Sequence, residues 1–200
     1  MILSDREIRA ALSRGALRIT PHPASEAWSS TALDLRLSND IILWKKPKVA
    51  GVEVPVSPFN PEYDFAALLR DHSERVVIPA DGFIMKSGTF LLGWTVEKIW
   101  LPHRSRLAAR VEGKSSLARL GIGVHVTAPT IHAGFGYKKD DEDYPGSPLQ
   151  LEIWNVGPLD VRLEGEMPVC QLIFEIVDGT PEKGYEGRFS IQGPTVAPAS

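Results

Sequence analysis

Apolar and polar residues alternate with a period of two along most of the chain. Residues 32–37 (ALDLRL) show the pattern plainly, and such alternation is typical of half-buried β-strands. Turn-forming pairs such as Asp81-Gly82 and Gly157-Pro158 separate the alternating segments. Further strands are predicted at residues 76–78, 90–96, 107–111, 124–126, 149–154, 161–163 and 169–176. The pattern therefore predicts a mainly β domain of the sandwich, jelly-roll or barrel type.

Two short segments are predicted to be helical. Residues 4–14 open with Ser4-Asp5-Arg6-Glu7, which has the character of a capping box, and Gly15 is suited to end the helix. Residues 65–70 (FAALLR) predict one or two further helical turns.

Two other segments have no period. Residues 137–148 (YKKDDEDYPGSP) are polar and acidic between two apolar strands, and are predicted to form a long exposed hairpin loop. The residues from Asp178 onward are predicted to form a tail, either disordered or ordered on a partner or ligand.

The composition is that of an ordinary globular protein. Of the 200 residues, 43% are hydrophobic and 24% are charged, and the formal net charge is −3. This charge gives no overall basic field to attract nucleic acid or an anionic membrane, so neither is expected as a partner. No apolar run approaches the roughly 18–20 residues that span a bilayer. The charged, amphipathic start is not expected to be a secretory signal.

The cysteine and histidine content narrows the chemistry. Cys170 is the one cysteine, which excludes an internal disulfide framework and a zinc site built on several thiolates. It fits a reducing cytoplasm, which is the expected location. The five histidines show no metal-ligand spacing beyond the pair 125 and 132, so no metal site made of side chains is expected. A P-loop, a GxGxxG turn, an HExxH helix and a GxSxG elbow are also missing from the sequence.

Residues 113–121 (GKSSLARLG) combine a lysine, two serines and an arginine after a glycine. Hydroxyl and backbone N–H groups bind phosphate oxygens, while Lys114 and Arg119 neutralise their charge, so the segment is suited to an anion site. A surface turn with solvated cations would use the same residues. Both interpretations stay open on spacing alone.

Glu152 is the second candidate. Alternation in residues 149–154 places it on one face with Gln150 and Trp154, and the leucines and isoleucine on the other. A carboxyl group beside an aromatic ring and an amide suits a general acid and base in a partly desolvated pocket. A solvent-facing glutamate on a half-buried strand is the alternative.

Taken together, these motifs resemble the dCTP deaminase branch of the dUTPase-like superfamily. The similarity is carried by residues 2–8 (ILSDREI), 33–37 (LDLRL), 113–121, 124–128 (VHVTA), 133–136 (AGFG), 151–155 (LEIWN), 170–174 (CQLIF) and 187–194 (GRFSIQGP). They occur in the family's order and cover most of residues 1–40 and 90–195, whereas residues 41–75 carry little of the similarity.

The resemblance implies a homotrimer of distorted jelly rolls with active sites at the subunit interfaces. Residues 1–177 would form a single β domain, and residues 178–200 a C-terminal lid. The implied activity is deamination of dCTP, or a close cytosine nucleotide, to dUTP and ammonia without zinc, with Mg²⁺ arriving on the nucleotide triphosphate. A dUTPase-like nucleotide pyrophosphatase, alone or bifunctional, and a trimer that binds nucleotide without turnover are the alternatives.

Roles for individual residues follow from the same resemblance. Glu152 would shuttle protons between the attacking water and the cytosine ring. Ser115 and the carbonyl group of Ala128 would hold that water, and Arg119 would orient the glutamate. The residues expected to contact the nucleotide are Lys114, Ser116, His132, Phe135, Gln171, Tyr185, Arg188 and Gln192.

The sequence departs from the family pattern in two places. His132 stands where the family has an aspartate that contacts the sugar 3′-hydroxyl group, and a neutral imidazole accepts one hydrogen bond but does not replace an anionic base. Residues 137–148 are longer than the family's turn and begin beside the expected sugar site. A divergent member of the family is therefore predicted.

Overall fold

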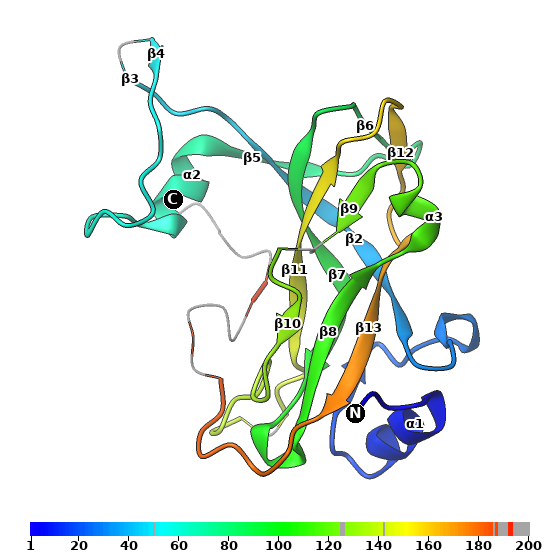
Figure 1. Cartoon of the computed structure of the whole chain (residues 1–200). Helices are drawn as coiled ribbons and strands as arrows, with labels where there is room; N and C mark the ends of the chain where they lie inside the picture. The colour runs from blue at the N-terminus through cyan, green and yellow to red at the C-terminus, as the bar shows by residue number, and fades with distance from the viewer. Residues whose placement is uncertain (50, 125–126, 142, 186, 188–191, 194–200) are drawn as a thin grey trace.

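The computed structural model describes residues 1–49, 51–124, 127–141, 143–185, 187 and 192–193. Strands dominate this part of the chain (Figure 1). The strands are β1 (Arg18–Thr20), β2 (Leu33–Trp44), β3 (Lys48–Val49), β4 (Val52–Glu53), β5 (Ser73–Val77), β6 (Phe83–Met85), β7 (Phe90–Trp100), β8 (Leu107–Gly113), β9 (Ile122–Val124), β10 (Thr130–Ile131), β11 (Ser147–Asn155), β12 (Val161–Leu163) and β13 (Pro168–Ile176). The helices are α1 (Asp5–Ser13), α2 (Phe65–His72) and α3 (Ser115–Ala118), with short 3₁₀ turns at Ser25–Ala27 and His103–Ser105.

The long strands form one curled antiparallel sheet. Its order is β10-β8-β13-β2-β7-β11-β9, with β1 added to β7 and β5 added to β2. β2 joins the two halves, because its first residues pair with β13 and its last residues pair with β5 and β7. In Figure 1 the strands β8 and β13 lie in front and β7 and β11 behind, so the sheet curves around its interior. The predicted mainly β, jelly-roll-like fold class is thereby confirmed.

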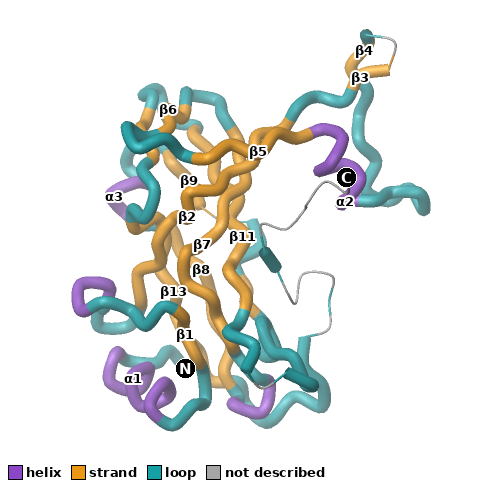
Figure 2. Tube along the Cα trace, turned by 180° about the vertical axis from the view of Figure 1, so that it is seen from behind, coloured by secondary structure: helices purple, strands orange, loops and turns teal. Residues whose placement is uncertain are grey.

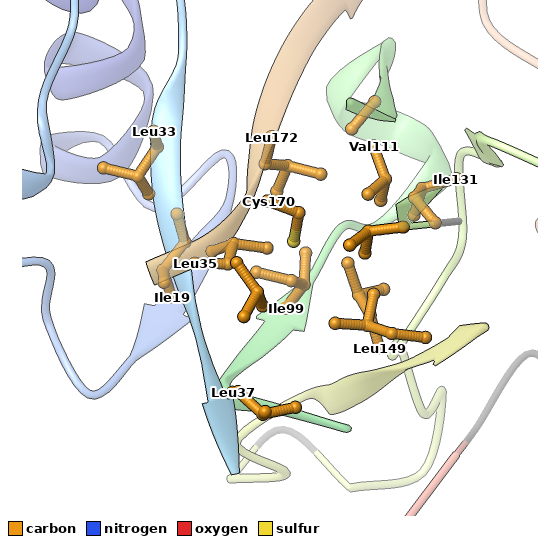
Figure 3. Close-up of a cluster of buried hydrophobic side chains, with 14 of the residues drawn as sticks. Ile19, Leu33, Leu35, Leu37, Ile99, Val111, Ile131, Leu149, Cys170 and Leu172 are labelled. Carbon is orange, nitrogen blue, oxygen red and sulfur yellow. The ribbon is translucent and has the colours of Figure 1, made fainter. Parts of the chain in front are cut away.

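The interior is filled by alternate residues of these strands. Leu33, Leu35 and Leu37 of β2 are fully buried, as the alternation in the sequence predicts. Figure 3 shows Leu35 close to Ile99 and Cys170, with Leu33 and Leu37 nearer the edges of the group, and all of them belong to one buried cluster with Val111. Most helices and loops therefore lie outside the curled sheet.

A second apolar cluster lies on the outer face of the sheet. Ile42 of β2, Leu92 and Trp94 of β7 and Leu69 of α2 are buried there, outside the main core. The strand β7 is apolar on both faces for this reason, since one face meets the core and the other meets α2. Residues 45–72, which carry β3, β4 and α2, are called the arm below. Figure 2 shows β3 and β4 standing away from the sheet, with α2 nearer to it.

A partly buried ion pair joins β2 to β7. The Glu97 side chain accepts hydrogen bonds from the backbone N–H group and the Nε of Arg36, at 2.8 and 2.7 Å. Arg36 also donates to Glu166, at 2.9 Å. The hydrogen bond to Glu97 raises the pKa of the Arg36 guanidinium above its ordinary value.

The predicted helices agree with the structure to within two residues at each end.

The hairpin predicted at residues 137–148 is wrong, however. The loop joins β10 to β11, but β10 pairs with β8, and β11 pairs with β7 and β9. Gly136 and Gly146 both adopt positive φ and lie against the backbone of Ile99, so the base of this loop is fixed to β7. Ser147 and Pro148 already belong to β11 and are buried.

Two further findings concern the whole described chain. No helix in the described ranges is long and apolar enough to cross a membrane. Cys170 is fully buried, as expected for an unreactive thiol, and burial raises its pKa well above the ordinary range.

Candidate active site

A cavity of about 570 Å³ lies on the outer face of β7 and β11. Its volume is within the range of small-molecule sites, roughly 300–1,000 Å³. The described residues that line it are Trp44, Tyr63, Phe65, Phe90, Leu92, Ala128, Thr130, Ile131, His132, Phe135, Leu149, Gln150, Glu152, Tyr185 and Gln192. Glu152 is the one carboxylate among them, and no lysine or arginine is included.

The position of Glu152 follows from the pattern of its strand. Leu151 and Ile153 are buried in the main core, so Glu152 between them points to the outer face and into the cavity. It stands directly opposite Leu92 in the β11–β7 pairing, and Gln150 stands opposite Trp94. A carboxyl group held against apolar side chains in this way is placed to give and accept protons on a bound ligand.

His132 and Phe135, in the turn at residues 132–136, also line the cavity. This turn is fixed to Leu101 by two backbone hydrogen bonds, from Gly134 at 2.7 Å and to the carbonyl group of Phe135 at 2.9 Å. Phe135 is buried and His132 is exposed, and both line the cavity. Their contact with a nucleotide stays a prediction. Ala128, predicted to hold the water through its carbonyl group, also lines the cavity.

Tyr185 and Gln192, from the C-terminal segment, also line the cavity. Tyr185 donates a backbone hydrogen bond to Ala133 at 2.9 Å, and its ring lies 5.0 Å from that of His132. Gln192 accepts a hydrogen bond from the backbone of Gln150 at 2.6 Å and donates its own N–H to Ser147 Oγ at 3.0 Å. Two of the three residues predicted in the tail thus line the cavity, and the third, Arg188, lies outside the described residues.

The remaining predicted residues form a separate group. Lys114 Nζ pairs with Asp34, and Gln171 Nε2 donates to the other oxygen of the same carboxylate at 2.9 Å. Ser115, Ser116 and Arg119 are on or just after α3, at the surface. None of these five predicted residues lines the cavity of Glu152. Figures 1 and 2 agree in placing α3 and α2 on opposite sides of the sheet.

Asn155 is a conspicuous polar residue that has a structural role. It is fully buried, donates to the carbonyl groups of Met85 and Leu159, and accepts from Gly157. Gly157 in turn lies against Gly121, which ends the turn after α3. Asn155 therefore fixes the loop on which the α3 segment rests.

Nine of the described lining residues are not among the site residues predicted from the sequence, and five of these nine are apolar or aromatic side chains from β2, β7 and residues 63–65. These five are Trp44, Tyr63, Phe65, Phe90 and Leu92. One signal for them exists, because residues 90–96 (FLLGWTV) are apolar at both alternate sets of positions, which indicates that both faces of the strand are covered. The covering element is α2, whose first residue, Phe65, comes from a part of the chain with little similarity to the family.

Within the described ranges, no group of three or more histidine, cysteine, aspartate or glutamate side chains is arranged to hold a metal ion. Fold and site together define a mainly β protein with one carboxylate among the described residues of a cavity of ligand size.

Comparison with known proteins shows to which family the chain belongs. The sequence model of the dCTP deaminase-like family matches residues 2–177. A dCTP deaminase of Rhodospirillum rubrum is 32% identical over 185 residues, which cover 92% of this chain and 87% of that protein. A protein of Methanosphaera stadtmanae named "dCTP deaminase, dUMP-forming" is 34% identical, with 94% of this chain and 87% of that protein covered. The chain belongs to the dCTP deaminase-like family.

A solved structure has the same fold. The 2′-deoxycytidine 5′-triphosphate deaminase from Agrobacterium tumefaciens superposes with a TM-score of 0.63 over 88% of this chain, at 22% sequence identity. The match covers 48% of that protein, so this chain spans about half its length. At this identity the match supports the fold alone.

Proposed function

We propose that the protein removes ammonia from the cytosine ring of dCTP, or of a close cytosine nucleotide, by hydrolysis. The observation that carries this proposal is Glu152, the one carboxylate among the described residues of a cavity in a chain that belongs to the dCTP deaminase-like family. The names of the relatives in Rhodospirillum rubrum and Methanosphaera stadtmanae support the same substrate.

One carboxyl group is sufficient for the proton transfers. Glu152 takes a proton from water as the oxygen bonds to C4, and delivers a proton to N3 of the ring. The tetrahedral intermediate then collapses, the C4–N bond breaks, and the amino group leaves as ammonia with a proton passed through the same carboxyl group. Because the chain has one cysteine, it lacks the pair of thiolates that hold the water-activating zinc ion in zinc deaminases. Activation therefore falls to Glu152 and to fixed hydrogen-bond partners such as the carbonyl group of Ala128.

A second copy of the chain completes the site in this proposal. Ser115 and Arg119 are exposed on the α3 side of the protomer, and the cavity of Glu152 has no cation among its described lining residues. In a homotrimer, the Lys114–Arg119 segment of one protomer would meet the cavity of the next. Lys114, Ser116 and Gln171 would then bind the triphosphate, which arrives with its Mg²⁺, while Ser115 and Arg119 would act at Glu152.

The activity is tested by following two products in parallel. Purified protein is incubated with Mg²⁺ and a panel of cytosine nucleotides, and ammonia and pyrophosphate are measured. Ammonia from dCTP without pyrophosphate supports a single-function deaminase. Release of pyrophosphate without ammonia would instead support a nucleotide pyrophosphatase. If the nucleotides bind but neither product forms, the protein binds nucleotide without turnover.

The shared site is tested by mixing two inactive subunits. Ser115→Ala and Glu152→Gln chains are each expected to be inactive as pure assemblies. When the two are co-expressed in equal amounts, about a quarter of the sites should receive both intact residues and regain activity, because each residue comes from a different subunit. A mixture as inactive as its parents would show that both residues act within one chain.

A further inference from the structure

The cavity has an apolar end and a polar end. Trp44, Phe65 and Leu92 gather at one end with Tyr63 and Phe90, and these five side chains come from the arm and the strands it covers. The rest of the lining holds the polar residues Thr130, His132, Gln150, Tyr185 and Gln192 among the apolar residues Ala128, Ile131, Phe135 and Leu149, and is called the polar end because the hydrogen-bonding amide and imidazole side chains are there. Glu152 lies between the two, because its partner across the strands is Leu92 and its neighbour along the same face is Gln150.

This polarity orients a nucleotide in the cavity. A triphosphate needs cations and hydrogen-bond donors. Neither end has a lysine or arginine among its described residues, but the amide and imidazole donors of His132, Gln150 and Gln192 belong to the polar end. At the other end, His132 and Tyr185 also border a second hollow that Lys183 lines. The phosphates are therefore expected toward the C-terminal segment, and the base toward the arm.

The position of Glu152 then decides which edge of the base meets the apolar end. On the proposed function, on which this inference rests, Glu152 must reach N3 and the amino group on C4. The ring neighbours of C4 are N3 and C5, so a base that turns N3 toward Glu152 turns C5 away from it, past Leu92 and toward the rings of Phe65 and Trp44. The C5 edge of cytosine is itself apolar and suits such surroundings.

The apolar end is held in place by the arm. Phe65 is the first residue of α2, whose N-terminus is capped by Asp64 through hydrogen bonds from Ala66 and Ala67 at 2.9 and 3.3 Å. Its ring lies 6.2 Å from that of Trp44, and Leu69, one turn later, is buried with Leu92. The rings are thus positioned before any ligand binds.

We infer that the arm is a specificity element for the base, and that its aromatic residues admit cytosine nucleotides with an apolar substituent on C5. Phe65 is the residue that carries this role, because it joins the anchored helix α2 to the cavity. A methyl group on C5 would be buried against the rings of Phe65 and Trp44 rather than left in water.

The test compares the binding of dCTP and 5-methyl-dCTP to the full-length protein by calorimetry, with Glu152→Gln in every variant so that no ligand is consumed. The parent should bind 5-methyl-dCTP about fourfold more tightly, the effect of burying one methyl group. Phe65→Ala should abolish this preference. Phe65→Trp, which fills the space, should weaken 5-methyl-dCTP about tenfold relative to dCTP. Phe59→Ala is the control, since Phe59 lies on the same arm but is 98% exposed.

The outcomes separate this inference from the proposed function. A parent that rejects 5-methyl-dCTP, or a preference that neither Phe65 variant changes, overturns the inference even if the wild type deaminates dCTP. A preference that depends on Phe65, in a wild-type protein that releases no ammonia, supports the inference and overturns the proposed function. If neither nucleotide binds, both fail.

Discussion

Glu152 and Leu92 face each other across β11 and β7, so the candidate catalytic carboxyl group lies beside an apolar side chain that the arm covers. A carboxylate in such a position exchanges protons with a bound ligand under little competition from water. The same pairing connects the apolar cluster under α2 with the rest of the cavity. Leu92 belongs to that cluster, and Glu152 lines the cavity together with residues of the turn at 132–136.

The docking of the C-terminal segment depends on Gly134. Its φ is +105°, and a Cβ at this position would overlap the backbone of Gly184 and Tyr185. Gly134→Ala is therefore expected to displace Tyr185 from the cavity and to raise the KM for dCTP about tenfold or more. Steady-state kinetics would measure the change.

The matched control is Gly179→Ala. Gly179 also has a positive φ, of +81°, but a Cβ added at that position would meet no atom within 4 Å. In this variant the added backbone strain should lower the free energy of unfolding by about 1 kcal/mol, and the KM for dCTP should stay unchanged. An equal change of KM in both variants would show that docking of Tyr185 is irrelevant to nucleotide binding.

His132 is expected to govern recognition of the sugar. It lines the cavity against Tyr185, at the position where the family resemblance implies an aspartate that contacts the 3′-hydroxyl group. His132→Asp should strengthen binding of dCTP about tenfold, since a charged acceptor forms the stronger hydrogen bond. Binding of 2′,3′-dideoxy-CTP, which lacks that hydroxyl group, should not improve. Parallel gains for both nucleotides would contradict the sugar-site assignment.

The pair of Arg36 and Glu97 is expected to stabilise the junction of β2 and β7. The Glu97 side chain is 5% exposed, so Glu97→Ala leaves Arg36 without its buried partner. We expect a loss of about 2–3 kcal/mol in the free energy of unfolding, measured by denaturant titration. The control is Glu74→Ala, which removes the exposed pair of Glu74 with Lys45 and should cost less than about 0.5 kcal/mol. Similar losses of unfolding free energy in both variants would show that the pair of Arg36 and Glu97 does not stabilise this junction more than an exposed pair does.

Cys170 gives a prediction on pH. Burial, together with the negative charges of Glu97 and Asp34, raises the pKa of its thiol in the folded protein above the ordinary value of 9.0. The folded chain then keeps a proton that the unfolded chain releases, so this contribution to stability is complete below pH 9 and declines as the pH rises.

The decline should reach about 1.4 kcal/mol per pH unit above the ordinary pKa. Cys170→Ala should remove this slope, which would appear as the difference between the two proteins in denaturant titrations at about pH 8–11. In the wild type, a thiol reagent at about pH 8 should react only after unfolding, because the reactive thiolate is suppressed by burial. Rapid labelling of the folded protein would contradict the assignment.

The sequence predicted those features that depend on local pattern. The alternation in residues 149–154 predicts that Glu152 lies on one face of its strand and that Leu151 and Ile153 lie on the other, buried face. The structure confirms that arrangement. The pairing of strands was less accessible. Two apolar segments flank the loop after β10, and this local pattern predicts a hairpin. The contact of Gly136 and Gly146 with Ile99 of β7 cannot be predicted from the residues next to these glycines, because Ile99 is distant in the sequence.

The arm shows the same limit. FAALLR was predicted as a helix, but which face of the sheet it would cover depends on contacts with Ile42 and Leu92, from strands before and after it in the chain. The aromatic end of the cavity was therefore missed. Residues 114–119 and Glu152 are predicted to act together, but they lie apart within the protomer. The proposed homotrimer is the arrangement that would bring them together.

In the proposed deamination, Glu152 moves the protons. Glu152→Gln keeps the shape and hydrogen bonding of the side chain but exchanges no protons. Ammonia release from dCTP should fall by about a thousandfold or more, while the Kd for dCTP changes less than about threefold. Glu164→Gln, on an exposed turn, should match the wild type. Ammonia release that persists in Glu152→Gln at the wild-type rate would contradict the account.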